Sequence, residues 1–199
     1  MNQEKIKNII HELKKQNITL VAASKGRTEK EIRNIYSLGI THFGENYVQE
    51  AETKIKVLAD LNITWHCIGH VQSSKVNKAK RLFQNIDTID SEELAKKIDG
   101  NILLQVNISI EKQKKGILPE EIPELLKKIK ELQNVICQGF MMIGSKENSV
   151  EEFKEIKKMF DQYKKQYNLT RLSMGMSDTY KEAIKQGATE VRLGRILFE

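Results

Sequence analysis

Strand-like and helix-like segments alternate along the whole chain of 199 residues. Short apolar runs predict strands at about residues 18–24, 40–44, 63–69, 86–89, 101–108, 135–143, 169–174 and 189–193. Between them, apolar residues recur at spacings of three and four, which is typical of amphipathic helices. Because strands joined through helices pair in parallel by right-handed crossovers, this order constrains the chain to an α/β fold.

Eight such units predict a closed (β/α)8 barrel of the TIM type. The alternative is an open doubly wound sheet, but the sequence contains neither Gly-x-Gly-x-x-Gly after the first strand nor Gly-x-x-x-x-Gly-Lys-Ser/Thr. Few residues follow the last strand, so we expect the N-terminal helix, residues 1–16, to pack where the last barrel helix would stand. The length is that of one domain, residues 1–199.

Several predicted helices carry starting signals. Thr28 with Glu31, and Ser149 with Glu152, have the spacing of a capping box. Pro123 suits the first turn of the helix predicted from residue 119. These signals fix where each strand gives way to a helix, and therefore where the loops at the carboxyl ends of the strands lie.

Composition narrows the class of protein. Hydrophobic residues make up 39% and charged residues 30% of the chain, which excludes a disordered protein. No apolar stretch approaches the ~18 residues of a membrane helix. The charged first twenty residues do not resemble a secretory signal, so we expect a cytoplasmic protein. The net charge of +6 is spread over both halves, with Lys and Glu alternating at helical spacing, which argues against a nucleic-acid partner.

Lys25 is the first candidate for chemistry. It follows Leu-Val-Ala-Ala-Ser, so it stands at the carboxyl end of the first strand, where barrels place their active sites. A lysine that is partly desolvated and near other cations loses proton affinity and becomes a nucleophile that forms Schiff bases. The alternative is an ordinary exposed lysine at a strand end.

Glycine-containing segments follow the last two strands, at residues 173–178 and 191–195. Ser177 is predicted to begin a helix there, whose free N–H groups can bind an anion. Loops after the seventh and eighth strands of barrels often form a phosphate site, so the two segments together predict a phosphate-containing ligand. Arg192 lies across the seam from Lys25 and could reach a ring or a carboxylate above the barrel. The alternatives are an ordinary helix cap and a surface arginine.

A metal site is not predicted. His42, His66 and His70 lie on two adjacent strands, but their spacing is not that of a compact ligand set. The nearby segment around Asn46 combines a tight turn with polar side chains at the end of the second strand.

Taken together, these features resemble the pyridoxal phosphate homeostasis protein family over nearly the whole chain. The segments that carry the resemblance are Ala23–Lys25, Phe43–Glu50, Trp65–Lys75, Ser173–Asp178 and Val191–Gly194. The resemblance implies a fold-type III barrel like the N-terminal domain of alanine racemase, with pyridoxal 5′-phosphate (PLP) as the cofactor.

The resemblance also implies the role of each site residue. Lys25 would carry PLP as an internal aldimine, and Arg192 would face the pyridine nitrogen. The other predicted cofactor-binding residues are Asn46 beside the ring, Met142 and Ser173 at the ends of the sixth and seventh strands, and Ser177, Gly194 and Arg195 around the phosphate. Relatives commonly carry Thr or Ser in place of Arg195, so its contact is made by the backbone alone or gains a guanidinium.

The function that this resemblance implies is intracellular supply and buffering of PLP, without an established reaction. A guanidinium opposite the pyridine nitrogen leaves that nitrogen unprotonated, which makes the ring a weak electron sink. We therefore expect a monomeric PLP-binding protein rather than an enzyme, with apo PLP-dependent enzymes as further partners. The alternatives are a small PLP-dependent amino-acid racemase and a barrel enzyme that uses Lys25 without PLP.

Overall fold

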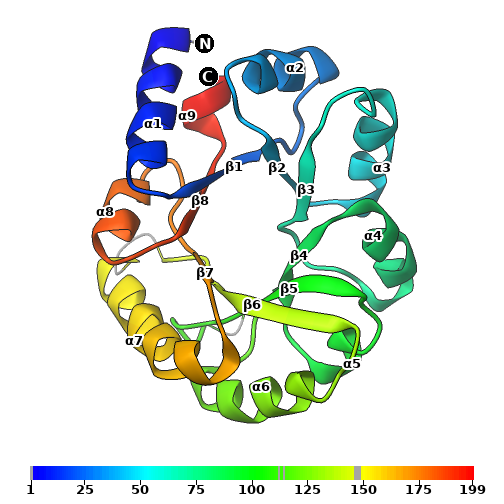
Figure 1. Cartoon of the computed structure of the whole chain (residues 1–199), viewed down its shortest axis with the longest axis vertical. Coiled ribbons are helices and arrows are strands. Elements are labelled where there is room, and N and C mark those ends of the chain that lie inside the picture. The colour runs from blue at the N-terminus through cyan, green and yellow to red at the C-terminus, as the bar shows by residue number, and fades with distance from the viewer. Residues whose placement is uncertain (1, 112, 114, 146–148) are drawn as a thin grey trace.

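The computed structural model describes residues 2–111, 113, 115–145 and 149–199. In this part of the chain, eight parallel strands close into a barrel in sequence order, as predicted (Figure 1). The strands are β1 Thr19–Ala23, β2 His42–Glu45, β3 Thr64–Cys67, β4 Asn85–Ile89, β5 Gly100–Gln105, β6 Val135–Met141, β7 Arg171–Ser173 and β8 Glu190–Leu193.

Helices surround the barrel on the outside (Figure 1). They are α1 Gln3–Lys15, α2 Glu29–Ser37, α3 Val48–Val57, α4 Val76–Leu82, α5 Glu92–Ala95, α6 Ile122–Lys130, α7 Ser149–Tyr167, α8 Tyr180–Lys185 and α9 Arg195–Phe198, with single 3₁₀ turns η1 Ser73–Lys75 and η2 Pro119–Glu121. Helix α1 lies between α8 and α2, which confirms the predicted place of the N-terminal helix. The short helix α9, which the sequence analysis did not expect, follows β8 directly.

The capping signals are confirmed in part. At α2, Glu31 N donates to Thr28 Oγ1 over 3.3 Å and Thr28 N donates to Glu31 Oε2 over 2.8 Å, which completes the predicted capping box. Helix α7 instead begins at Ser149 itself, and the residue before it lies outside the described part of the chain. The carboxylate of Glu152 accepts a hydrogen bond from Ser145 N over 2.7 Å.

The prediction that Ser177 begins a helix is wrong. Helix α8 begins at Tyr180, because Thr179 N and Tyr180 N both donate to Met176 O and form a turn first. Ser177 therefore lies in the loop between β7 and α8. This loop still approaches the end of β8, as described below.

An apolar layer between the strands and the helices sets the rotation of each strand. The rings of Phe43 and Trp65 lie side by side on β2 and β3, with centroids 5.9 Å apart. Phe140 on β6 meets Phe160 on α7 edge to face, at 6.2 Å. Each such fully buried ring contributes roughly 1.5–3 kcal/mol. Because side chains alternate along a strand, burying one set against the helices turns the other set into the barrel.

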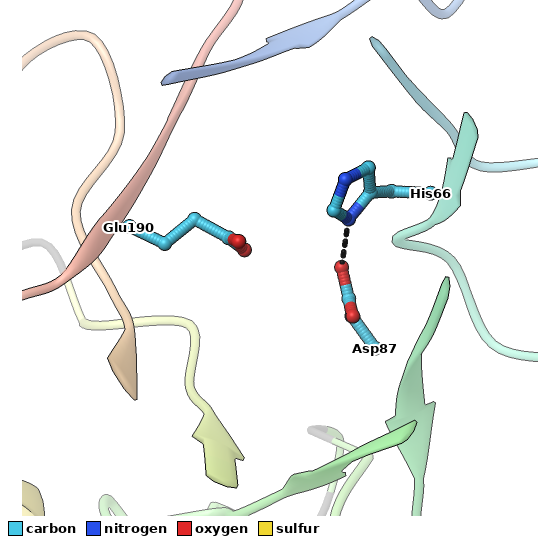
Figure 2. Close-up of side chains that lie close together, drawn as sticks. All are labelled: His66, Asp87 and Glu190. Carbon is cyan, nitrogen blue, oxygen red and sulfur yellow. Dashed lines mark hydrogen bonds and ion pairs between the residues drawn. The ribbon is translucent and has the colours of Figure 1, made fainter. Parts of the chain in front are cut away.

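Buried polar side chains point into the inside of the barrel, among them His66, Asp87 and Glu190 (Figure 2). With Arg171 and His42 they form what we call the barrel-floor cluster, since His42, Arg171 and Glu190 are the first residues of β2, β7 and β8. The centre of this barrel-floor cluster is Arg171, whose Nη2 lies 3.1 Å from Asp87 Oδ1 and 2.8 Å from Glu190 Oε2. His66 donates from Nδ1 to Asp87 Oδ2 over 2.8 Å, and its Nε2 lies 3.0 Å from Nδ1 of His42. These contacts join β2, β3, β4, β7 and β8, and they balance two carboxylates that would be costly to bury alone.

His42 in the barrel-floor cluster is held in its neutral form by its surroundings. One proton between His42 Nδ1 and His66 Nε2 completes their hydrogen bond, whereas two would set N–H against N–H. Burial lowers the pKa of His42, and the charge of His66 lowers it further. Of the other charged groups that face His42, Glu190 and Asp87 raise this pKa and Arg171 lowers it.

We expect the free energy of unfolding to decrease as the pH falls below about 6.5, the ordinary pKa of a histidine. The folded-state pKa of His42 is lowered, so the unfolded chain takes up more protons. The stability that the neutral His42 ring contributes is fully present above the pKa of histidine in the unfolded chain. It is lost as the pH falls through the lower pKa of His42 in the folded protein. Urea denaturation between about pH 5 and 8 measures this. His42→Gln should flatten the slope, and His11→Gln, on an exposed position of α1, should not. Equal slopes in the wild type and His42→Gln would contradict this account.

Gly139 on β6 pairs with Arg171 on β7, the centre of the barrel-floor cluster. The register between β5 and β6 shifts next to it, and its φ is +153°. A Cβ at this position would lie 1.7 Å from the carbonyl oxygen of Arg171, which is backbone and cannot move aside. The pairing of β6 with β7 therefore requires glycine here.

We expect Gly139→Ala to lower the free energy of unfolding by more than about 2 kcal/mol, because strain in φ and a backbone clash add together. Gly100→Ala is the matched control, since Gly100 has a φ of +118° but no atom within 4 Å of the added Cβ. Gly100→Ala should lower the free energy of unfolding by less, because only the conformational cost of the positive φ remains. Denaturant midpoints measure both, and equal losses would show that the clash is relieved elsewhere.

Candidate functional site

Lys25 stands at the barrel mouth, directly after β1 and Ser24. Its side chain is exposed, and its Nζ lies 5.2 Å from the centroid of the Tyr47 ring, in the range of a cation–π contact. The charge of Lys25 also contributes to lowering the pKa of Glu50. The expectation of a partly desolvated amine is therefore wrong, because the side chain is exposed and contacts an aromatic ring. The amine is accessible from solvent at the end of the barrel where chemistry is expected.

The loops after β7 and β8 meet at Ser177. Its Oγ accepts hydrogen bonds from Gly194 N over 3.3 Å and from Ile196 N over 3.4 Å. The exposed guanidinium of Arg195 pairs with Asp178 of the same loop. The predicted convergence of these two segments is confirmed. They gather a hydroxyl and two backbone N–H groups, which are donors of the kind that bind phosphate-like anions.

The guanidinium of Arg192 is held rigidly. Its side chain is 5% exposed, Nη1 donates to Ser173 Oγ over 2.7 Å, and Nη2 donates to Met142 O over 2.8 Å. Burial lowers the pKa of Arg192, although Glu190 raises it. The expectation of a surface arginine is thereby excluded, and three of the predicted site residues, from the ends of β6, β7 and β8, lie in contact.

The barrel seam brings these groups close to the lysine. Strand β1 pairs with β8 in the register Val21 with Arg192 and Ala22 with Leu193. A Cβ on Gly194 would lie 3.6 Å from the Cβ of Ala23, two residues before Lys25. A small molecule with a carbonyl group at one end and an anionic group at the other therefore has partners for both on one side of the mouth.

Asn46 lies on the adjacent part of the rim. It is half-buried and follows β2, and a Cβ on Gly69 would lie 2.2 Å from its carbonyl oxygen. The loops after β2 and β3 are thus packed directly on each other. Within the described part of the chain, no hydrogen bond joins Asn46 to Lys25 or Arg192, so its place beside a bound ring remains a prediction.

A buried ion-pair cluster under Lys25 was not predicted from the sequence. We call it the Lys54 cluster; it consists of Ser24, Glu45, Glu50 and Lys54. The only sign of this cluster in the sequence is weak: the polar residues Ser24 and Glu45 each stand at the end of an apolar run. Their partner on α3 could not be found from local pattern, since the contact depends on how the helix packs over the two strands.

The histidines do not form a metal site with one another. His42 and His66 lie together, but Nδ1 of His70 lies 3.6 Å from Asp90 in another part of the barrel. Donor atoms of His66, Asp87 and Glu190 do lie within 4.8 Å of one another (Figure 2). However, Nη2 of Arg171 is within 3.2 Å of all three, so a guanidinium already stands where an ion would.

None of the helices in the described residues has a stretch that is long and apolar enough to cross a bilayer.

Comparisons with known proteins extend over the whole chain. The family model described as alanine racemase, N-terminal domain, matches residues 2–199. The pyridoxal phosphate homeostasis protein of Caenorhabditis elegans is 41% identical over 205 residues, which cover 90% of this chain and 84% of that protein. The protein of the same name from Haemophilus influenzae is 35% identical over 199 residues, covering 91% and 84% of the two chains.

Solved structures agree with these relatives. PipY of Synechococcus elongatus PCC7942, determined with PLP bound, is 32% identical and superposes with a TM-score of 0.86, covering 98% of this chain and 100% of that one. Alanine racemase of Corynebacterium glutamicum is 13% identical with a TM-score of 0.77, covering 98% of this chain and 61% of that one, which shows a shared fold. With the barrel, its seam and the rim loops in place, the chain belongs to the pyridoxal phosphate homeostasis protein family, which has the barrel fold of the alanine racemase N-terminal domain.

Proposed function

We propose that this protein binds PLP on Lys25 and acts in intracellular PLP homeostasis. The observation that carries the proposal is the pairing of β1 with β8, which sets an accessible lysine amine beside the donors that meet at Ser177. When bound, the aldehyde of PLP supplies the carbon that forms a Schiff base with that amine. The names of the curated relatives and the PLP-bound structure of PipY support the same function.

The residues present fit the anionic end of PLP. Gly194 N and Ile196 N each lie within hydrogen-bonding distance of Ser177 Oγ, to which they donate. A phosphate bound there would replace Ser177 Oγ as the acceptor of the two N–H groups and accept from the Ser177 hydroxyl as well, which is how loops at helix starts hold phosphate. Because Asp178 holds the guanidinium of Arg195 at the surface, we propose that Arg195 contributes its backbone rather than its side chain.

The residues also fit the ring. Ser173 and Met142 orient the guanidinium of Arg192, which we place opposite the pyridine nitrogen. A guanidinium keeps its proton in a protein, so this nitrogen accepts a hydrogen bond and remains unprotonated. We place Asn46 along the ring edge. The electron-withdrawing power of PLP is then weak, which suits storage better than transamination.

We further propose that the protein has no dedicated reaction. Racemisation needs a second acid or base on the opposite face of the substrate carbon, and a well-placed one contributes about 10²–10⁴-fold. The likeness to alanine racemases is one of fold. The exposure of Lys25 at the mouth favours exchange of the cofactor with acceptor amines, including those of apo PLP-dependent enzymes. We propose one monomeric, cytoplasmic PLP-binding domain for residues 1–199.

Borohydride reduction of the protein loaded with PLP should fix a pyridoxyl group on Lys25, because the reduced bond no longer hydrolyses. Peptide mass mapping identifies the modified residue. Lys25→Ala should show no adduct at any site, and Lys75→Ala, which removes a half-buried lysine of η1, should show the wild-type adduct. An adduct on Lys75, or none in the wild type, would contradict the assignment.

Ser177→Ala should weaken PLP binding roughly 10- to 100-fold, because a hydrogen bond to a charged group contributes about 1.5–3 kcal/mol. Pyridoxal, which has the same aldehyde but no phosphate, should bind the variant and the wild type equally. Absorbance titration with each compound measures the two affinities. Ser37→Ala, at an exposed position of α2, is the control. An equal loss for both compounds would place the phosphate elsewhere.

A further inference from the structure

The ammonium of Lys54 is buried under the loop that carries Lys25. Its Nζ donates to Glu45 Oε1 over 2.6 Å, to Glu50 Oε1 over 2.7 Å and to the carbonyl oxygen of Ser24 over 2.6 Å. A lysine has three N–H donors, so all three are used. The side chain of Lys54 is 10% exposed and that of Glu45 is 0% exposed, which makes this a buried, short-contact group.

The Lys54 cluster holds the chain on both sides of Lys25. On one side, the carbonyl of Ser24 accepts from Lys54, and the hydroxyl of Ser24 donates to Glu45 Oε1 over 2.6 Å. On the other side, Gly26 N donates to Glu50 Oε1 over 2.6 Å. The backbone that presents Lys25 is therefore fastened to α3 and β2, whereas the side chain of Lys25 extends freely to the Tyr47 ring.

Packing alone does not account for this arrangement. Replacing a buried ion pair by apolar side chains of similar volume is often neutral or stabilising, because desolvation offsets the attraction. Here desolvation is offset even less, because Glu45 Oε2 is buried without a hydrogen-bond partner among the described residues. Burial raises the pKa of Glu45, against the hydrogen bonds from Lys54 and Ser24. A costly group in this place indicates a task other than stability.

We propose that Lys54 is a positioning residue, which together with Glu45 and Glu50 fixes the backbone around Lys25 so that its amine meets the aldehyde of a phosphate-anchored ligand. This inference rests on the proposed function, because it assigns a role in forming the bond between Lys25 and PLP. The phosphate loops hold one end of the ligand, so the distance to the amine is set by how firmly the lysine loop is held. Misplacement by about 1 Å can cost 10²-fold in rate.

The test separates bond formation from binding. Lys54→Met keeps the length of the side chain and removes its three donors. It should slow the formation of the borohydride-reducible adduct on Lys25 roughly 10- to 100-fold. Pyridoxine 5′-phosphate, which has the phosphate and ring but no aldehyde, should bind with unchanged affinity, because the loops at Ser177 and Gly194 are untouched. Lys54→Arg, which restores a cation with several donors, should recover part of the rate.

Lys78→Met is the matched control. Lys78 on α4 makes a similar ion pair with Glu52, at 2.8 Å, but both side chains are exposed and the pair does not touch the lysine loop. Its adduct should form at the wild-type rate. Should Lys54→Met fail to fold, Glu50→Ala serves instead: Glu50 is half-buried on a helix, and its removal frees Gly26 N. Glu50→Ala should also slow adduct formation on Lys25.

Three results would overturn the inference. A wild-type rate in folded Lys54→Met would show that the cluster has no part in presenting Lys25. An equal loss of adduct formation and of pyridoxine 5′-phosphate affinity would show that Lys54 supports the fold generally. Absence of any adduct on Lys25 in the wild type would overturn the proposed function itself. This result is distinguished from the other two because it is seen in the wild-type protein, without any variant.

Discussion

Closure of the barrel between β1 and β8 is the constraint on which the site depends. Thr19 N donates to Thr189 O over 2.9 Å at the start of this seam, and the register continues to Ala22 and Leu193. Lys25 and the Gly194 loop belong to opposite ends of the chain, and no local structure could bring them together. Parallel pairing does so because the carboxyl ends of both strands then emerge at the same rim. Any change that opened the seam would separate the amine from the phosphate donors without altering either.

The two ends of the barrel perform different tasks. At the amino-terminal end, Arg171 gathers Asp87 and Glu190 from other strands, so the ion pairs there hold the barrel closed. At the carboxyl end, the loops after β7 and β8 meet through hydrogen bonds to Ser177 and through the pair of Arg195 with Asp178, and Lys25 is exposed above the Lys54 cluster. Paired side chains thus occupy the inside of the barrel at the end where no ligand is expected, whereas the loops at the other end present accessible groups to one. This division is general among barrels of this type.

Sequence pattern predicted the parts of the structure that depend on local periodicity and on topology. The eight strands, the place of α1, and the meeting of the last two loops follow from alternation and from the rules for parallel sheets. The start of α8 was missed because Thr179 and Tyr180 first close a turn on Met176, which no capping pattern reveals. The cluster around Lys54 was missed because its members meet through tertiary packing. The identity of PLP came from family resemblance, since periodicity carries no information about a ligand.

A storage protein must hold its cofactor firmly and still release it, and this site has separate means for each. In the proposed arrangement, the donors around Ser177 hold the phosphate by contacts that persist whether or not a covalent bond exists. The bond to Lys25 is reversible by water or by another amine, and both reach it because the lysine is exposed at the rim. In the proposed arrangement, a rigid Arg192 opposite the pyridine nitrogen keeps the ring from stabilising a carbanion, so an incoming amino acid would exchange with the lysine without further reaction. Retention therefore depends on a phosphate affinity and on an imine bond, and the role proposed for the Lys54 cluster is to set how fast that bond forms. Tuning the position of one amine changes how readily PLP leaves without weakening the selectivity of its binding.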